Sequence, residues 1–330
     1  MGEKTGIVLL NLGGPDSLDA VGPFLYNLFS DPDIIDFPLS FLFRKRLAKL
    51  ISSKRAPRVS LQYKEIGGKS PLKEHTLKQA ALLEKRLSGS LDAKVYVAMR
   101  YWHPSTGEAV GSVDGDGITN VILLPLYPQF SMATTTSSLK EWNAELERRG
   151  LTGKINSSLI DSYHIHPAYI DAIVDRIKTT LEKFPPETRE TVHLVFSAHG
   201  TPMKLVRKGD PYSGHIAETV EAVVQTGGWG QEHSLCYQSK VGPLKWLTPS
   251  TPDTIMELAS KGVKNMLVVP IAFTSDHLET LFELDIEYRK VAMANGVERY
   301  EVIEGLNDSP IFIEALAELV LEKVVAKTPA

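Results

Sequence analysis

The sequence predicts an α/β protein with two similar doubly wound halves, each built on a mostly parallel sheet flanked by helices. Short β-branched runs alternate with segments of helical periodicity such as residues 72–87, which is typical of parallel α/β folds. The expected strands are residues 6–10, 94–99, 119–124, 192–197, 235–238 and 264–271. The chain also repeats itself, because 8-VLLNLGGP-15 aligns with 195-VFSAHGTP-202, and 121-VILLPLYPQFS-131 aligns with 266-MLVVPIAFTSD-276. Two matches in the same order favour an internal duplication over a chance likeness of strand–turn–helix joints.

The two halves differ in their polar residues. We place the first half at residues 1–165 and the second at 166–330, with the last helix packing back on the first half. In the internal alignment Leu12 stands at the place of His199, Ser131 at that of Asp276 and Thr134 at that of Glu279. Open parallel sheets bind ligands beyond the carboxyl ends of their strands, where His199 and the 276–279 turn are both expected. The second half therefore holds the candidate chemistry.

Composition limits the kinds of partner and cofactor. The chain has 330 residues, 43% of them hydrophobic, and a formal net charge of −4, so it shows no general excess of cations for a nucleic acid. Cys236 is the only cysteine, which excludes an internal disulfide, a cysteine-based zinc site and an iron–sulfur cluster ligated by this chain alone. The opening MGEKTGIVLLNLGG lacks a signal-peptide core, and no apolar run approaches the roughly 18 residues of a spanning helix. We expect a soluble protein in a reducing compartment.

A histidine is expected at the end of a strand. In 191-TVHLVFSAHGTP-202 an apolar strand ends at Ala-His-Gly, where Gly200 permits a sharp turn and Pro202 can begin a helix. An imidazole at a sheet edge can accept a proton near neutral pH or bind a metal such as Fe(II). The alternative is a loop histidine bonded to the backbone, and this segment alone leaves both interpretations of His199 open.

A row of carboxylates follows the last long strand. In 268-VVPIAFTSDHLETLFELDIEY-288 the strand ends near Phe273, and Ser275 or Asp276 can cap the helix that follows. The carboxylates that recur every fourth residue, on one helical face, are Glu279, Glu283 and Glu287. Such a face is either solvated surface or a route for protons or hard cations, and the spacing alone favours neither.

Two segments of the first half combine aromatic and cationic side chains. In 99-MRYWHPSTGEA-109 a strand end delivers Arg100, Tyr101 and Trp102, which suit a large flat anionic ligand or form a core with one buried ion pair. The aromatic runs 24-FLYNLF-29 and 37-FPLSFLF-43 precede the basic cluster 44-RKRLAKLISSKRAPR-58. That flank fits an anionic membrane or ligand carboxylates, or it is a helical hairpin with a solvated face.

Seven stretches, spread over nearly the whole chain, carry a family likeness. They are 10-LNLGGPD-16, 62-QYKEIGGKSPL-72, 100-RYWHP-104, 125-PLYPQFS-131, 196-FSAHGTP-202 with 208-KGDPY-212, 237-YQSKVGPLKWLTPST-251 and 270-PIAFTSDHLETLFELDIEY-288. With these stretches in family order, the chain resembles the ferrochelatase family. The resemblance implies a chelatase-like fold of two Rossmann-like halves with a porphyrin cleft between them, and an enzyme that inserts ferrous iron into a porphyrin.

The resemblance also implies roles for individual residues. His199 and Glu279 form the central pair, as catalytic groups and metal ligands, with His277 and Glu283 in support and Asp276 shaping the turn. The porphyrin would contact Leu12, Arg100, Tyr101, Trp246 and Phe273, with Arg55, Tyr63 and Ser70 near its propionates on a lip at about 20–72. Leu12 departs from the methionine often found there in the family, so contacts on that porphyrin face are expected to differ. Which of His199 and Glu279 takes protons and which binds iron stays open.

The resemblance implies that porphyrin and Fe(II) are substrates and that there is no resident cofactor. The chain ends at residue 330 without the cysteines that some family members carry in a C-terminal extension, so no iron–sulfur cluster is expected. The LNLGGP start and the lip favour protoporphyrin IX as substrate and haem as product; the alternatives are a coproporphyrin III ferrochelatase and a non-catalytic tetrapyrrole-binding protein. We expect a cytoplasmic monomer or homodimer with peripheral contact at the inner face of the membrane, an upstream haem-pathway enzyme as partner and no nucleic acid.

Overall fold

The computed structural model describes residues 4–32, 40–240 and 244–326, and part of the predicted lip, residues 33–39, lies outside these ranges. The chain forms two compact units. Unit 1 comprises Met1–Leu126, Met132–Asp161 and Ala317–Ala330, and unit 2 comprises Tyr127–Ser131 and Ser162–Leu316. The boundary after residue 165 stays a prediction for where independently folding domains divide. No helix within the described ranges is long and apolar enough to span a bilayer.

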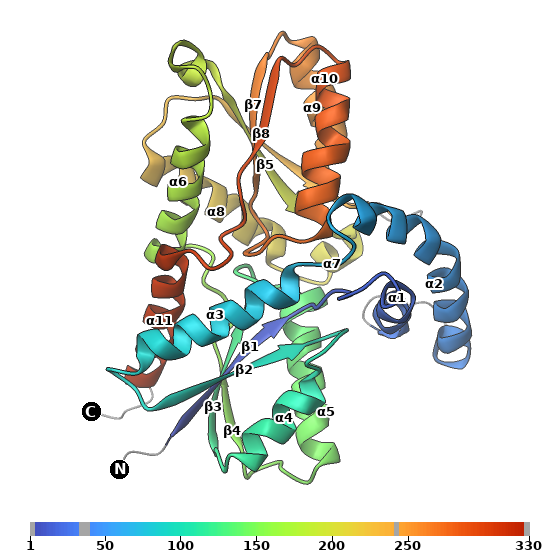
Figure 1. The fold of residues 1–330 in the computed structure, drawn as a ribbon, viewed down its shortest axis with the longest axis vertical. Coiled ribbons are helices and arrows are strands. Elements are labelled where there is room, and N and C mark those ends of the chain that lie inside the picture. The colour runs from blue at the N-terminus through green and yellow to red at the C-terminus, as the bar shows by residue number, and fades with distance from the viewer. Residues whose placement is uncertain (1–3, 33–39, 241–243, 327–330) are drawn as a thin grey trace. The chain divides into compact units, whose positions relative to one another are not determined.

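Unit 1 is built on a four-stranded parallel sheet with the strand order β2-β1-β3-β4 (Figure 1). Its elements are β1 (Thr5–Asn11), α1 (Val21–Ser30), α2 (Ser40–Glu65), α3 (Leu72–Leu87), β2 (Ala93–Met99), α4 (Thr106–Gly115), β3 (Asn120–Pro125), the π-helix η1 (Met132–Thr136), α5 (Ser137–Arg148) and β4 (Asn156–Leu159). Side chains alternate between the faces of a strand, so Val8 and Leu123 pack with Val110 of α4 and Trp142 of α5 in one apolar cluster. Helix α3 packs against β1 and β2, and α1 packs against α2.

Unit 2 has the same plan, with the strand order β6-β5-β7-β8 (Figure 1). Its elements are α6 (Pro167–Leu181), the 3-10 helix η2 (Pro186–Thr191), β5 (His193–His199), α7 (Met203–Arg207), α8 (Tyr212–Gly227), β6 (His233–Gln238), α9 (Thr251–Ser260), β7 (Asn265–Pro270), the π-helix η3 (Glu279–Glu287), α10 (Tyr288–Ala294) and β8 (Arg299–Val302). Helix α11 (Pro310–Val325) begins in unit 2, and its residues from Ala317 onward belong to unit 1. Val195 and Val268 pack with Ile255 of α9 and Ala292 of α10. Helices α6 and α8 pack against each other, and α6 contacts β7.

The internal duplication is confirmed in detail. Leu10 pairs with Pro125 in the first sheet, and Ser197 pairs with Pro270 in the second, as the internal alignment requires. A π-helix follows the third strand of each sheet. The predicted fold of two similar doubly wound halves is therefore correct.

Candidate functional site

His199 is the last residue of β5 and lies at the carboxyl edge of its sheet. The Tyr212 hydroxyl donates to the His199 carbonyl oxygen at 2.9 Å, which fixes the backbone there. Gly200 N donates to the Gln238 carbonyl oxygen at 2.9 Å, and a Cβ at Gly200 would lie 2.7 Å from that oxygen. Close approach of two strands, rather than left-handed backbone, therefore requires glycine after the histidine.

His199 and Glu279 form a direct pair, as the sequence predicts. Nδ1 of His199 lies 2.9 Å from Oε2 of Glu279, and the two side chains are 38% and 26% exposed. Burial disfavours the imidazolium, but the Glu279 carboxylate outweighs it, so the pKa of His199 is raised. Burial likewise opposes ionisation of Glu279, and the attraction of His199 overcomes it and lowers the pKa of Glu279 to about 2. The two groups together can hold a proton or present a nitrogen and an oxygen to a metal.

Aromatic rings surround this pair within unit 2. The ring of Phe273 lies 6.3 Å from that of His199, and the ring of Trp246 lies 6.5 Å from it. Phe273 also packs on His277, with ring centroids 4.4 Å apart. Burial lowers the pKa of His277, which favours the neutral imidazole there. Phe273, Trp246 and His277 thus join the central pair, and the apolar rings of Phe273 and Trp246 suit a flat, apolar ligand.

A second carboxylate, Glu283, is joined to the pair through Ser239. The Ser239 hydroxyl lies 2.8 Å from Oε2 of Glu279 and 3.0 Å from Oε2 of Glu283, and Ser239 N donates to Oε1 of Glu283 at 3.1 Å. The Tyr288 hydroxyl donates to the same Oε1 at 2.5 Å. Burial and the neighbouring Glu279 raise the pKa of Glu283. The adjacent carboxylates are therefore unequal, since Glu279 is held ionised while Glu283 retains a proton more readily.

The helix that carries both glutamates differs from the prediction. The expectation of a helix capped by Ser275 or Asp276 is wrong, because the first residue is Glu279 and the residue before it, Leu278, makes no side-chain cap. The backbone N–H of Tyr288 bonds the carbonyl of Glu283, five residues back, which is the π-helical pattern. Glu279 and Glu283 nevertheless share a face, because both reach Ser239.

Asp276 is a buried anchor of the turn before this helix. Its Oδ1 accepts from the Thr280 hydroxyl at 2.9 Å, and its Oδ2 accepts from Gly305 N at 3.1 Å and Asn307 Nδ2 at 2.7 Å. Its own N donates to Asn307 Oδ1 at 2.9 Å. These bonds tie the start of η3 to the loop after β8. A direct part for Asp276 in catalysis stays a prediction.

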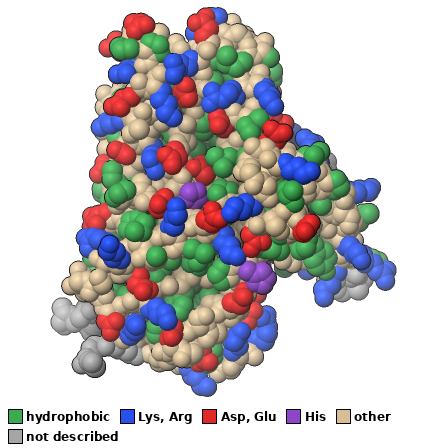
Figure 2. All heavy atoms as spheres, viewed as in Figure 1, with side chains coloured by type: hydrophobic (Ala, Val, Ile, Leu, Met, Phe, Trp, Pro, Cys, Tyr) green, Lys and Arg blue, Asp and Glu red, His purple; other side chains and the backbone are tan. Residues whose placement is uncertain are grey.

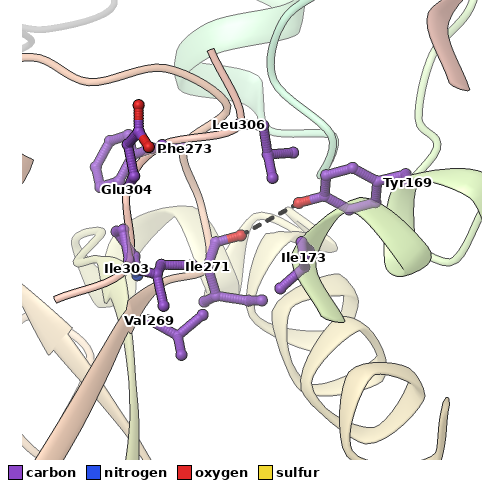
Figure 3. A pocket seen from close by; sticks show the side chains of 10 residues that line it. Tyr169, Ile173, Val269, Ile271, Phe273, Ile303, Glu304 and Leu306 are labelled. Carbon is purple, nitrogen blue, oxygen red and sulfur yellow. Dashed lines mark hydrogen bonds between the residues drawn. The ribbon is translucent and has the colours of Figure 1, made fainter. Parts of the chain in front are cut away.

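A small pocket supports the segment that carries Phe273 (Figure 3). Its lining includes Tyr169, Ile173, Ile303 and Leu306, which are mostly apolar. The Tyr169 hydroxyl donates to the Ile271 carbonyl oxygen at 3.4 Å, as the dashed line shows. Neither residue of the central pair lines this pocket, so it braces the end of β7 and is not the candidate site itself.

In unit 1, Arg100 and Tyr101 converge on Asp31. Arg100 pairs with Oδ2 of Asp31 at 2.7 Å, and the Tyr101 hydroxyl donates to the same oxygen at 2.6 Å. The Asp31 side chain is 1% exposed, and burial together with Asp31 raises the pKa of Tyr101. The Arg100–Asp31 pair is therefore the buried ion pair that the sequence permits as the alternative to a ligand-binding role. Contact of Arg100 and Tyr101 with porphyrin stays a prediction.

The other predicted residues of unit 1 fall into two environments. Ser70 and Tyr63 are buried, and Ser70 N donates to the Pro15 carbonyl at 2.8 Å. Arg55 is exposed on α2, with its guanidinium 5.4 Å from the Phe29 ring. Leu12 is half-buried, and its carbonyl accepts from Tyr101 N at 3.0 Å. Ser70 thus bonds the segment 10-LNLGGPD-16, and Leu12, which belongs to that segment, bonds Tyr101. Arg55, by contrast, is exposed and can bind an anion from solution.

Sequence reasoning missed the polar residues that hold the two glutamates: Gln238, Ser239 and Tyr288. Gln238 Nε2 lies 3.4 Å from Oε2 of Glu279, and the Ser197 hydroxyl fixes Gln238 by donating to its Oε1 at 3.0 Å. The sequence Tyr-Gln-Ser at the carboxyl end of β6 was a signal, because β6 is adjacent to β5 and parallel strands end at the same edge of the sheet. Within the described ranges no group of three or more His, Cys, Asp or Glu side chains is arranged to hold a metal ion.

Comparison with known proteins identifies the family. The family model described as Ferrochelatase matches residues 4–324. A ferrochelatase of Gloeobacter violaceus is 48% identical over 323 residues, which cover 97% of this chain and 98% of that protein. A ferrochelatase of Citrifermentans bemidjiense is 48% identical over 327 residues, which cover 99% of this chain and 100% of that protein.

Solved structures share the fold at low identity. The chain matches SirB from Bacillus subtilis with Fe3+ at a TM-score of 0.57 and 14% identity, covering 97% of this chain and 95% of that one. It matches CbiX, the terminal enzyme for biosynthesis of siroheme in denitrifying bacteria, at a TM-score of 0.50 and 12% identity, covering 96% and 98%. These structures support the chelatase fold alone. By its match over residues 4–324 and its full-length relatives, the chain belongs to the ferrochelatase family.

Proposed function

We propose that this protein inserts Fe(II) into protoporphyrin IX to give haem, with release of two protons. Family membership makes the chain a metal chelatase of haem synthesis. The pairing of His199 with Glu279 carries the proposal, because the reaction needs an acceptor for pyrrole protons and oxygen or nitrogen ligands for iron. Iron is a substrate here, and we propose no resident cofactor.

We assign the base to His199. Its imidazole accepts a pyrrole proton, and the Glu279 carboxylate stabilises the imidazolium that forms. Glu279 and Glu283, joined through Ser239, then carry protons away or bring iron in. A site with two protein ligands suits a metal that must pass on to the porphyrin, whereas a closed set of four suits a metal that stays.

The porphyrin must also change shape. The lone pairs of the pyrrole nitrogens have to point out of the ring plane to meet the metal, and a planar macrocycle does this poorly. We propose that the site binds a bent porphyrin more tightly than a flat one, so that binding energy favours the transition-state geometry. The rings of Phe273 and Trp246 beside His199 are the surfaces on which such a shape would be imposed.

Anaerobic loss of porphyrin fluorescence with Fe(II) tests the function. We expect the wild-type protein to consume protoporphyrin IX faster than coproporphyrin III. The reverse preference would replace protoporphyrin by coproporphyrin III as the substrate. Tight porphyrin binding without insertion of iron would instead leave a non-catalytic tetrapyrrole-binding protein.

We also propose that the protein is cytoplasmic and that α2 rests on the anionic inner face of the membrane. Figure 2 shows Lys and Arg side chains with hydrophobic ones among them over this helix. Phe43, Leu50 and Leu61 are 52%, 53% and 61% exposed, and their spacing puts them on one helical face. Lys54 lies on that same face, and Arg46 lies at its side. Exposed apolar side chains within a basic helix favour a bilayer surface over a solvated one.

Co-sedimentation with lipid vesicles tests this contact. We expect binding to mixed phosphatidylserine and phosphatidylcholine vesicles and little to phosphatidylcholine alone, because each cation near an anionic surface contributes about 1 kcal/mol. The double variant Leu50→Glu, Leu61→Glu should lose most of the binding. Leu82→Glu, at an exposed position of α3, is the matched control and should bind as the wild type does. Equal binding by the double variant would contradict the proposed face.

A further inference from the structure

Ser239 has an uncommon backbone conformation next to the central pair. It follows the last residue of β6, and its φ is 67°, in the left-handed region that residues other than glycine seldom adopt. Such a conformation persists only where surrounding contacts enforce it, and these contacts gather at functional sites. The contacts of Ser239 therefore indicate why this residue keeps a left-handed conformation.

The left-handed conformation lets one residue serve both glutamates. The backbone N–H of Ser239 bonds Oε1 of Glu283, and its hydroxyl lies within 3.0 Å of an oxygen of each carboxylate. The hydroxyl has a single hydrogen, so it can donate to one carboxylate at a time. Because its backbone N–H bonds Glu283 while its hydroxyl lies against Glu279, Ser239 fixes the distance between the two carboxylates.

The bonds that the described residues make to Glu279 all fall on one of its two oxygens. Oε2 receives the Ser239 hydroxyl at 2.8 Å, His199 Nδ1 at 2.9 Å and Gln238 Nε2 at 3.4 Å. Among the residues that the structure describes, none bonds Oε1 of Glu279. Three partners on Oε2 set the plane of the carboxylate and leave Oε1 for whatever enters the site.

Unit 1 offers an internal comparison. Met99 N bonds the Pro104 carbonyl as Tyr237 N bonds the Pro249 carbonyl, so the residues two places later, Tyr101 and Ser239, correspond. Tyr101 has an ordinary φ and gives its hydroxyl to the buried Asp31. The left-handed serine therefore belongs to the half that holds the carboxylate pair and is not a general feature of the repeated fold.

We propose that Ser239 is a positioning residue that holds Glu279 with Oε1 turned toward the substrate and keeps Glu283 beside it. The inference rests on the proposed function for the identity of that substrate. A group that orients a metal-binding or proton-accepting carboxylate typically changes affinity or activity by roughly 10–100-fold when it is removed.

The test compares Ser239→Gly with the wild type. Glycine adopts a φ of 67° without strain and lacks only the hydroxymethyl group, so the variant should fold as the wild type does. We expect kcat for iron insertion to fall by roughly 10–100-fold while KM for porphyrin changes little. Crystal structures of both proteins should show one conformer of Glu279 in the wild type and a displaced or divided one in the variant.

The matched control is Ser234→Gly, which removes a serine hydroxyl from β6, the strand that leads to Ser239, where it contacts His193. It should keep the wild-type kcat and the single Glu279 conformer. An unmoved Glu279 in Ser239→Gly would overturn the proposal, whatever the rate. A displaced Glu279 in a protein whose wild type inserts no iron would support the positioning role and refute the proposed function, so the two failures are distinct.

Discussion

Replacing His199 by alanine is expected to reduce iron insertion by roughly 10²–10⁴-fold, the usual contribution of a positioned acid or base. The imidazole lies against Glu279 at the carboxyl edge of β5, and its removal deletes the group to which we assign the pyrrole protons. Porphyrin binding should persist, because Phe273 and Trp246 remain. The measurement is anaerobic turnover together with porphyrin affinity.

The pH dependence of the rate separates this role from a loss of folding. Glu279 raises the pKa of His199, so the imidazole is protonated to a higher pH than an ordinary histidine. A base must be unprotonated, so the wild-type rate should fall as pH decreases through that pKa. The residual rate of His199→Ala should lack this fall. His103→Ala, an exposed histidine of unit 1, is the control and should keep both rate and profile.

A different result would reassign the residue. Normal turnover at saturating Fe(II), with only a weaker affinity for iron, would make His199 a metal ligand. The base would then be Glu279.

Asp276→Ala is expected to have the largest effect on stability. The substitution removes the acceptor that Gly305 N and Asn307 Nδ2 share, whereas the Thr280 hydroxyl keeps a bond to the His277 carbonyl at 3.2 Å. Each buried unsatisfied group costs about 1–3 kcal/mol, so with two such groups we expect the free energy of unfolding to drop by roughly 2 kcal/mol or more. That is a large share of the roughly 5–15 kcal/mol that holds a typical domain. Denaturant unfolding measures the change.

Two control substitutions show whether the loss of stability comes from the buried hydrogen bonds of Asp276. Asp276→Asn keeps the shape and one oxygen and should lose less stability than alanine. Asp285→Ala removes an aspartate that pairs with Arg289 at a partly exposed position, and should cost less than about 1 kcal/mol. An Asp276→Ala protein as stable as Asp285→Ala would show that the turn does not depend on this carboxylate.

The fold was predictable because two separate patterns indicate it. One is the periodicity of the strands and helices within each half, and the other is the sequence repeat that relates the two halves. The predicted helix at residues 72–87 has the bounds of α3. Strands β4 and β8 escaped prediction because they are short edge strands, and neither Asn-Ser-Ser-Leu nor Arg-Tyr-Glu-Val is an apolar run. Edge strands face solvent on one side, so their sequences carry a weaker hydrophobic signal.

The pair His199 and Glu279 was predictable because parallel strands end at the same sheet edge. Its surroundings were not. A serine carries no sign that its φ will be 67°, and a four-residue spacing of glutamates predicts an α-helix rather than the π-helix observed. Both features involve contacts between residues far apart in the sequence, chiefly the bonds from Ser239 to Glu283 and Glu279.

The short segment Tyr127–Ser131 follows β3 of unit 1 along the chain yet belongs to unit 2. Gln129 Nε2 bonds Thr219 Oγ1 at 3.1 Å and the Ile271 carbonyl at 3.2 Å, and Ser131 Oγ bonds Asp210 at 2.9 Å. A gene fragment that began at residue 162 would encode a unit 2 without these partners. The two halves therefore cannot be exchanged by a simple cut at residue 162. Recombination between relatives would have to transfer residues 127–131 together with the second half.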